Sequence, residues 1–289
     1  MKTFDEVLQL LRDMNNEIII LRGDQEQRQV LVSPQMVGRV MVSTMAGPKG
    51  EVLGWVNRPA VEAGFTDPNF NNYGGEERIW LGPDGTQQGL FFKNMDFTWE
   101  SFRIPQPMSM QPFETLGVSS DGKSVAMRAR WELNNLIGTP FQVEIKRRIT
   151  LLEVCPYTNE FGADVNCVGF QSDNMVTNVS SRPILRGTGP LTIWLLGHYL
   201  PHRRCVVIVP FRPGPQAELG PPLRDECVKF FCIDGKFPAN GRWYQNDYAL
   251  RKADCAVRCK FGIGRSRATG RAGSIDLDTN ELVIVDNDF

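Results

Sequence analysis

The stretch NNYGGEERIWLGPDGTQQGLFF, from Asn71 to Phe92, gathers side chains that could bind a polyhydroxylated ligand. Five glycines separate polar, charged and aromatic residues, which are Asn71, Asn72, Tyr73, Glu76, Glu77, Arg78, Trp80 and Gln88. Sugar hydroxyls both donate and accept hydrogen bonds, and sugar C–H faces pack on aromatic rings. The stretch therefore favours sugar binding. A tight β-turn with a solvated charge cluster is the alternative.

Composition limits the classes of protein and of partner. The 289 residues could form one large domain or two ordinary ones, and 19 prolines with 27 glycines favour a β-rich fold. Lysine plus arginine (32) nearly balance aspartate plus glutamate (33), for a net charge of −1. This balance argues against broad electrostatic attraction to nucleic acid or to an anionic membrane. The sequence makes no prediction of the oligomeric state.

The first sixteen residues predict a short amphipathic helix. Phe4, Val7, Leu8 and Leu11 recur at helical spacing, and a capping box is expected from Thr3 and Glu6. No apolar stretch reaches the roughly 20 residues that span a bilayer, and the N-terminus lacks a signal-peptide core. We therefore expect a protein of the cytoplasm.

Seven cysteines lie in the second half of the chain, at positions 155, 167, 205, 227, 232, 255 and 259. Their odd number, irregular spacing and the presence of only two histidines argue against a disulfide framework or a zinc cluster. Buried or incidental thiols are expected. A site between the pairs Cys227/Cys232 and Cys255/Cys259 is the alternative.

Residues 17–289 predict one β-sandwich domain, because short alternating or apolar segments recur along them without a linker. The expected strands are Glu17–Leu21, Arg28–Val32, Gly38–Thr44, Val52–Val56, Leu90–Lys93, Phe113–Ser119, Ser124–Leu133, Phe141–Leu152, Gly169–Asn178, Leu191–Leu196, Cys205–Phe211, Val228–Ile233, Tyr248–Gly262 and Leu282–Val285. In Phe141–Leu152, Arg147 stands at an otherwise apolar position, which indicates a bulge or a binding surface.

Several of these segments resemble an uncharacterised bacterial family with a galactose-mutarotase-like fold, in the aldose 1-epimerase superfamily. The family's order of blocks is matched by GRVMVST (Gly38–Thr44), GWVNR (Gly54–Arg58) and NNYGGEERIWLGPDG (Asn71–Gly85). A looser match to the superfamily follows in VTNVSSRP (Val176–Pro183) and LTIWLLGHY (Leu191–Tyr199).

The resemblance implies an antiparallel β-supersandwich, with a short N-terminal helix, that holds a sugar on its concave face. It also implies that the superfamily's catalytic carboxylate follows the position of Phe289. We therefore expect the chain to lack the C-terminal strands of that fold.

Aldose 1-epimerases interconvert sugar anomers with an acid and a base and need no metal or organic cofactor. By the resemblance, His198 is the candidate acid, and a satisfied structural histidine is the alternative. Glu76 and Glu77 are the carboxylates of the motif that could act as the base. The second histidine, His202, is expected to be exposed.

The same resemblance makes Arg78 a ligand-binding arginine, whose fork of donors could hold adjacent hydroxyls or a carboxylate. An ion pair of Arg78 with Glu76 or Glu77 is the alternative. Asn72, Gln88 and Asn57 are expected to bind hydroxyls, and Tyr73, Trp80 and Trp55 to supply stacking faces. Trp55 and Trp80 stand at strand-like positions, so a place in the core is the alternative for both.

The predicted function is carbohydrate binding, with anomer interconversion as a possible activity. A non-catalytic glycan-binding protein, and a structural β-sandwich in which the YGGEER segment is only a turn network, are the alternatives.

Overall fold

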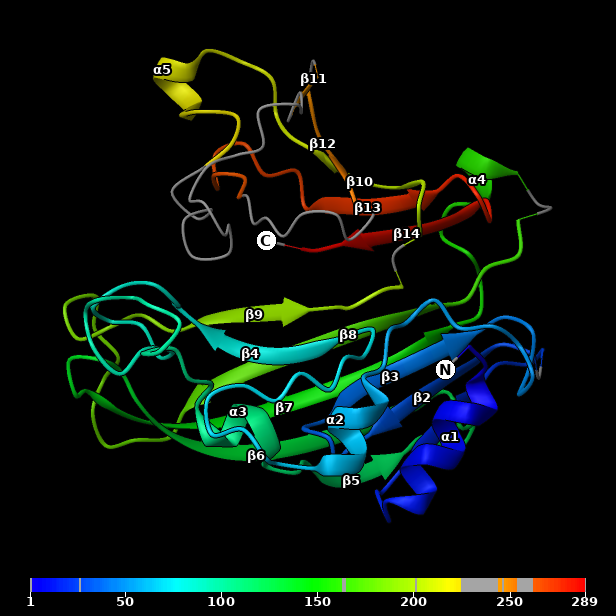
Figure 1. Ribbon diagram of the computed structural model, residues 1–289, viewed down its shortest axis with the longest axis horizontal. Helices are drawn as coiled ribbons and strands as arrows, with labels where there is room; N and C mark the ends of the chain where they lie inside the picture. The colour runs from blue at the N-terminus through cyan, green and yellow to red at the C-terminus, as the bar shows by residue number, and fades with distance from the viewer. Residues whose placement is uncertain are drawn as a thin grey trace. The chain divides into compact units, whose positions relative to one another are not determined.

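The structure is a computed structural model that describes residues 2–25, 27–162, 165–200, 202–224, 244–245, 247–253 and 262–288. The chain divides into two compact units, Met1–Leu200 and Pro201–Phe289, which we describe separately. Antiparallel sheets are the main structure of each unit (Figure 1), so the expected mainly β fold is confirmed. The domain predicted over residues 17–289 includes parts of both units.

The N-terminal helix α1 spans Phe4–Asp13 and confirms the predicted short helix. Its capping box is formed as expected, because the Thr3 hydroxyl accepts a hydrogen bond from the Glu6 amide while the Glu6 carboxylate accepts one from the Thr3 amide. The apolar face of α1 packs in a core that includes Leu31, Met41 and Tyr73. Within the described part of the chain, no helix has both the length and the apolar character needed to cross a membrane.

The largest sheet of the first unit has the strand order β5-β6-β7-β8. Its strands are β5 (Glu114–Val118), β6 (Ser124–Asn134), β7 (Pro140–Leu152) and β8 (Gly169–Asn178). Odd-numbered residues of β6 and β7 are buried, and even-numbered residues are more exposed, so this sheet has one core face. Arg147 follows this alternation and points into the core, and β7 has no register shift against either neighbour. The expected bulge or binding surface at Arg147 was therefore wrong.

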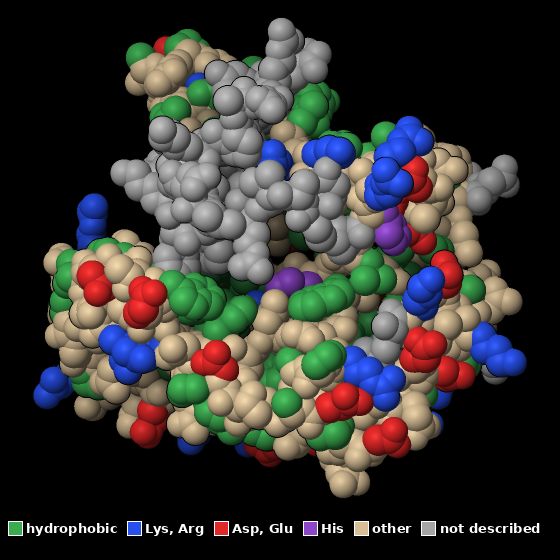
Figure 2. Space-filling view, viewed as in Figure 1, with side chains coloured by type: hydrophobic (Ala, Val, Ile, Leu, Met, Phe, Trp, Pro, Cys, Tyr) green, Lys and Arg blue, Asp and Glu red, His purple; other side chains and the backbone are tan. Residues whose placement is uncertain are grey.

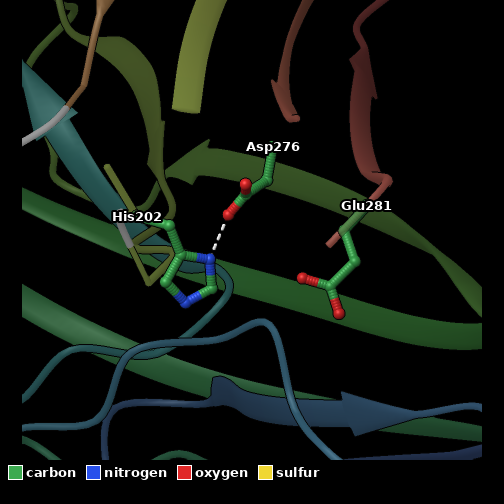
Figure 3. Close-up of side chains that lie close together, drawn as sticks. All are labelled: His202, Asp276 and Glu281. Atoms are coloured by element: carbon green, nitrogen blue, oxygen red, sulfur yellow. Dashed lines mark hydrogen bonds and ion pairs between the residues drawn. The ribbon is translucent and has the colours of Figure 1, made fainter. Parts of the chain in front are cut away.

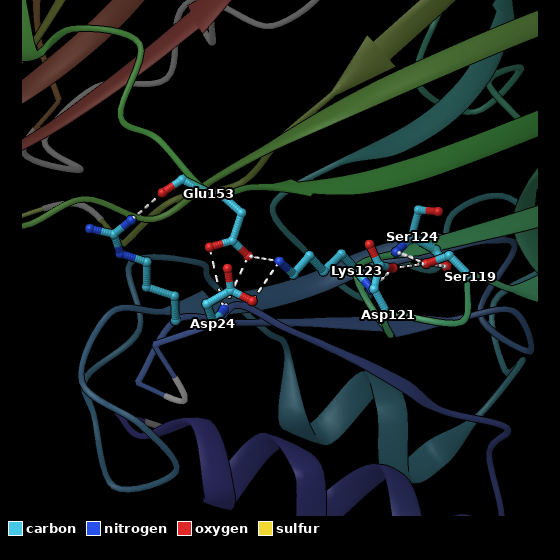
Figure 4. A network of polar contacts seen from close by, with 7 residues as sticks. Asp24, Ser119, Asp121, Lys123, Ser124 and Glu153 are labelled. Carbon is cyan, nitrogen blue, oxygen red and sulfur yellow. Dashed lines mark hydrogen bonds and ion pairs between the residues drawn. The ribbon is translucent and has the colours of Figure 1, made fainter.

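Two smaller sheets complete the first unit, with the orders β1-β2-β3 and β4-β9. Their strands are β1 (Ile19–Arg22), β2 (Gln29–Ser33), β3 (Arg39–Thr44), β4 (Arg78–Gly82) and β9 (Thr192–Leu196). A polar network joins the β1–β2 turn to the large sheet (Figure 4): the Lys123 ammonium lies 2.6 Å from Asp24 and 3.1 Å from Glu153. Three short helices connect strands, namely α2 (Arg58–Ala63), α3 (Gln106–Met110) and α4 (Thr158–Phe161).

The second unit contains a five-stranded antiparallel sheet with the order β11-β12-β10-β13-β14. Its strands are β10 (Cys205–Pro210), β11 (Tyr244–Gln245), β12 (Tyr248–Lys252), β13 (Arg271–Asp276) and β14 (Glu281–Asp286), and α5 spans Gln216–Leu219. The buried Arg267 donates to the carbonyls of Arg212, Gly214 and Gly220, and so holds the loop around α5.

Most expected strands occur within two residues of their predicted bounds, but several differ. Strands β4, β11 and β13 were missed. The predicted strands Val52–Val56 and Leu90–Lys93 form only isolated bridges. Strand β12 occupies the start of the predicted Tyr248–Gly262, and Val228–Ile233 lies outside the described residues.

Charged side chains of both signs are interspersed over the visible surface of the first unit (Figure 2). This agrees with the nearly balanced composition of the whole chain.

Candidate functional site

Three segments that are far apart in the sequence meet around Trp55. The Trp55 amide donates to the His198 carbonyl at 2.9 Å, and the Trp55 carbonyl accepts from the Gly75 amide at 2.8 Å. The His198 amide in turn donates to the Gly75 carbonyl at 2.9 Å. The GWVNR, YGGEER and GHY segments singled out in the sequence are therefore neighbours in space.

The two adjacent glycines of the YGGEER segment allow this close approach. Gly74 has φ of +82°, and a Cβ atom there would lie 2.1 Å from the Trp55 carbonyl oxygen. Gly75 has φ of +100°, and a Cβ atom there would lie 2.6 Å from Cδ of Arg39. L-residues with side chains rarely adopt these backbone angles, and no side chain fits in these spaces.

Arg78 is the first residue of β4 and is buried, with 3% of its surface exposed. Its guanidinium lies over the Trp80 ring, with Cζ 4.2 Å from the ring centroid. Nη1 donates to Oδ1 of Asn72 at the long distance of 3.5 Å, and Nε has no hydrogen-bond partner among the described residues. Burial, and secondarily the charge of Arg39, hold the pKa of Arg78 well below its usual value.

His198 follows strand β9 and is half-buried near this guanidinium. Leu196 pairs with Arg78 across the two strands, and His198 lies two residues further along the same segment. Burial, followed by the charges of Arg78 and Arg39, lowers the pKa of His198 to about 3, so its ring is neutral at pH 7. Its Nδ1 atom is buried without a partner in the described structure.

Asn72, Asn57 and Trp55 surround this pair. The Asn57 side-chain amide donates to the Asn72 carbonyl at 2.9 Å, which leaves the Asn72 side chain directed at Arg78. The Trp55 and His198 rings have centroids 5.7 Å apart. Trp55 is half-buried.

Glu76 is buried beside these residues but points toward backbone amides. Its Oε1 accepts a hydrogen bond from the Ser43 amide at 2.8 Å, and 3% of the surface of Glu76 is exposed. Burial raises the pKa of Glu76 to about 7, although hydrogen bonds from Ser43 and Gly54 favour the ionised form.

Glu77 is paired with an arginine that the sequence did not suggest. Its carboxylate forms an ion pair with the fully buried Arg147 of β7, and Arg147 also donates to Oδ1 of Asn174 at 3.0 Å. The pair joins the segment before β4 to the large sheet. Of the two ion pairs considered for Arg78, neither occurs in the described structure.

Three other predicted site residues do not join the Arg78–His198 pair. Tyr73 and Trp80 are in the core, and Gln88 lies away from the pair. Tyr73 packs in the core beside α1. Trp80 is 4% exposed, and its ring packs on Phe91 and Trp194 at centroid distances of 5.3 and 5.5 Å. Gln88 donates to the carbonyls that precede β9, at the end of the β4–β9 pair opposite Arg78.

Arg39 of β3 belongs to the same region and was missed in the sequence, where it was part of an expected strand. It is 2% exposed, donates to the Gly74 carbonyl and to the Met36 carbonyl (3.4 Å), and lies over the Tyr73 ring at 5.8 Å. Burial lowers the pKa of Arg39 to about 10. An arginine within a buried strand is the signal that could have revealed it. We call Arg39, Trp55, Asn72, Arg78 and His198 the Arg78 site.

Two surface hollows lie elsewhere. One is lined by residues 137–141, 180, 182–184 and 188 of the first unit, and the other lies around Thr269 in the second unit. Neither includes a residue of the Arg78 site. We therefore define the Arg78 site by its buried charged groups and its polar atoms without hydrogen-bond partners among the described residues, and not by a surface hollow.

A separate group of potential metal ligands lies in the second unit. Ligand atoms of His202, Asp276 and Glu281 all lie within 4.8 Å of one another. In Figure 3 the Nδ1 atom of His202 faces Asp276, with which it forms a hydrogen bond, while the Glu281 carboxylate lies to one side. The His202 side chain is 42% exposed, in agreement with its expected exposure.

Of the seven cysteines, three are described, and none of these three is in a disulfide. Cys155 and Cys205 are buried, and Cys167 is half-buried. The pairs Cys227/Cys232 and Cys255/Cys259 lie outside the described residues.

A protein-family model covers nearly the whole chain. The model for a family of unknown function, DUF6786, matches residues 2–289. The chain belongs to the DUF6786 family. The expectation of an uncharacterised family is thereby confirmed. No curated protein matches this DUF6786 chain.

One solved structure resembles the fold of this DUF6786 protein. It is the crystal structure of the Slr1438 protein from Synechocystis sp. PCC 6803, with a TM-score of 0.54 and 13% sequence identity. The match covers 94% of this chain and 77% of Slr1438. At this identity the similarity concerns the fold alone.

Proposed function

We propose that this protein binds a carbohydrate at the Arg78 site, on a galactose-mutarotase-like scaffold. The observation that carries the proposal is the meeting of three segments, around Trp55, Gly75 and His198, that were each singled out for sugar chemistry. If these segments were only separate structural turns, we would not expect their amide, guanidinium, imidazole and indole groups to lie together.

The side chains of the site suit the two kinds of surface that a sugar presents. Arg78 and Asn72 offer donors and an acceptor for hydroxyl groups, and their mutual hydrogen bond of 3.5 Å is weak enough to be replaced. The half-buried Trp55 offers an aromatic ring for the C–H side of a sugar ring. His198 adds a neutral ring whose Nδ1 atom has no partner among the described residues.

The geometry favours binding over anomer interconversion. Ring opening needs an acid and a base on either side of the sugar. Glu77 is paired with Arg147, and Glu76 points toward the Ser43 amide. The low pKa of His198, about 3, also makes a protonated acid form rare at pH 7. We therefore infer a binding protein that does not turn over its ligand by means of these residues.

Tryptophan fluorescence of the full chain, titrated with a panel of monosaccharides and oligosaccharides, tests the proposal. A saturable change with at least one sugar is expected, and its loss in Asn72→Ala, which keeps Trp55 as the fluorophore of the site, would locate the binding. The exposed Arg130→Gln serves as the control, because Arg130 lies on the outer face of β6. A panel without any saturable change would contradict carbohydrate binding and favour a structural role.

Anomer exchange measured by NMR separates binding from catalysis. We expect the exchange rate of a bound aldose to equal the rate without protein. Acceleration that disappears in His198→Gln would show instead that the site is catalytic.

A further inference from the structure

Three buried arginines lie near one another at the candidate site, two of them members of the Arg78 site. Arg39, Arg78 and Arg147 are 2%, 3% and 1% exposed, and they come from the three strands β3, β4 and β7. Arginine is almost never this buried without partners, because a guanidinium removed from water needs compensating acceptors.

Two of the three arginines have such acceptors. Arg147 forms its ion pair with Glu77 and a hydrogen bond to Asn174. Arg39 donates to the two backbone carbonyls of Gly74 and Met36. Each guanidinium is therefore held in place by other parts of the protein.

Arg78 lacks a comparable set of partners. Its only hydrogen bond to a described residue is the 3.5 Å contact with Asn72, and its Nε atom is buried without a partner. The contact with the Trp80 ring compensates for part of the lost hydration but satisfies no N–H group. A guanidinium that is 3% exposed and so poorly partnered points to an acceptor that the described residues do not supply.

The neighbouring carboxylates do not supply that acceptor. Glu77 is used by Arg147, and Oε1 of Glu76 accepts from the Ser43 amide on the other side of the segment. Near pH 7 Glu76 is also only partly ionised. Among the described residues, the three guanidinium groups therefore outnumber the carboxylates that pair with them, so positive charge is in excess at the Arg78 site.

We propose that the ligand of the Arg78 site is an acidic carbohydrate, whose carboxylate or phosphate oxygens pair with the Arg78 guanidinium. The planar fork of arginine matches both groups by two parallel hydrogen bonds, and Nε is one of the donors used in that geometry. The unpartnered Nδ1 atom of His198 offers a further contact. This inference rests on the proposed carbohydrate binding and specifies the class of sugar.

Isothermal titration calorimetry of the full chain tests the inference with five probes: glucuronate, glucose 6-phosphate, glucose, acetate and inorganic phosphate. All titrations use one ionic strength, because charge interactions depend on salt. At least one acidic sugar should bind about 10- to 100-fold more tightly than glucose, which is the range for a hydrogen bond to a charged group. The glucuronate and glucose 6-phosphate titrations distinguish a carboxylate from a phosphate.

Substitutions at Arg78 should remove this preference. Arg78→Gln is expected to bind the acidic sugar and glucose within about 3-fold of each other. Arg130→Gln removes an exposed arginine and should retain the full preference. If Arg78→Gln does not fold, Arg78→Lys keeps the positive charge but loses the fork, and should reduce the preference only partly.

The other outcomes separate this inference from the proposed function. Glucose binding as tight as either acidic sugar would overturn the acidic ligand and leave carbohydrate binding intact. Acetate or phosphate binding as tight as the matching sugar would retain the anion site but overturn its carbohydrate ligand. Failure of all five probes at about 10 mM would overturn the inference for these ligands, since even millimolar affinity would then be absent.

Discussion

Arg78 and Arg147 are both buried guanidinium groups, but they differ in what compensates their charge. Arg147 has a carboxylate and an amide oxygen, whereas Arg78 has one long hydrogen bond and an aromatic face. The free energy of burying a charge depends strongly on such partners. A structural arginine and a ligand-binding arginine should therefore respond differently to substitution.

We predict that Arg147→Met destabilises the protein by about 3–5 kcal/mol, because it leaves the Glu77 carboxylate without its buried partner. Arg78→Met should cost less than about 1 kcal/mol, because removal of an uncompensated charge offsets the lost contact with Trp80. Urea unfolding of both variants and the wild type measures the two values. Equal losses would mean that Arg78 is as well compensated as Arg147.

Glu76 should make stability depend on pH. Its pKa is raised from 4.5 to about 7 in the folded state, so the folded protein binds the proton more tightly than the unfolded chain. The stability that this group contributes is complete below pH 4.5 and is lost as the pH rises to about 7. The ionised form of Glu76 is thus the destabilising one.

Glu76→Gln should remove this loss. The variant's stability relative to the wild type should be about 2 to 3 kcal/mol greater at about pH 8 than at about pH 5. His198, whose pKa is lowered to about 3, acts in the opposite direction at acidic pH, but it is present in both proteins and cancels in the comparison. Denaturant titrations at the two pH values measure the difference, and a constant difference would show that Glu76 is ionised throughout.

Several site residues could be predicted from the sequence, and others could not. Arg78, Asn72, Asn57, Trp55 and His198 were selected by residue type and resemblance, and they do lie together. The pairing of Glu77 with Arg147 joins residues 70 positions apart, and no local pattern reveals such a partner.

At the scale of elements, the turn at Gly74 and Gly75 brings the site together. A backbone with positive φ reaches within van der Waals distance of Trp55, so both the angle and the space require glycine. A second glycine, with positive φ but no close neighbour, allows the cost of the backbone angle to be measured apart from the cost of the close approach. Gly122 also has positive φ, +71°, but a Cβ atom there would meet no atom within 4 Å.

We predict that Gly122→Ala destabilises the protein by about 1–2 kcal/mol, which is the cost of the left-handed conformation for alanine. Gly74→Ala should cost at least about 2 kcal/mol more, because its Cβ atom would also overlap the Trp55 carbonyl oxygen. Thermal unfolding measures both variants. Similar costs would indicate that the Trp55 segment moves away without loss.

Strand prediction was accurate for the alternating strands and also for the apolar run of β2, but it missed β4. Strands β6, β7 and β8 have alternating patterns that give their bounds within a residue or two. All five residues of β4 are buried, so no alternation marks it, and its neighbouring glycines suggested a turn.

At the scale of the whole molecule, the candidate site is assembled from residues between 39 and 198, all within the first compact unit. Composition predicted the mainly β class, and the order of motifs predicted an uncharacterised family. Both composition and motif order can be read from the sequence as a whole. They could not predict the division at Leu200 and Pro201, since no composition shift marks it.

The balanced charge of the chain predicts that it does not bind nucleic acid. The net charge is −1, and the charges visible on the first unit are interspersed (Figure 2). Fluorescence anisotropy of a labelled DNA duplex at about 0.1 M salt should show no binding tighter than about 10⁻⁴ M. Tighter, salt-dependent binding would reveal a basic surface that the overall balance conceals.

A crystal structure of the protein with a bound acidic sugar tests the central claim most directly. We predict that the sugar ring lies against Trp55 and His198, with a carboxylate or phosphate oxygen about 3 Å from the Nε and Nη atoms of Arg78. A sugar bound elsewhere, or an Arg78 guanidinium paired with a carboxylate of the protein itself, would contradict it.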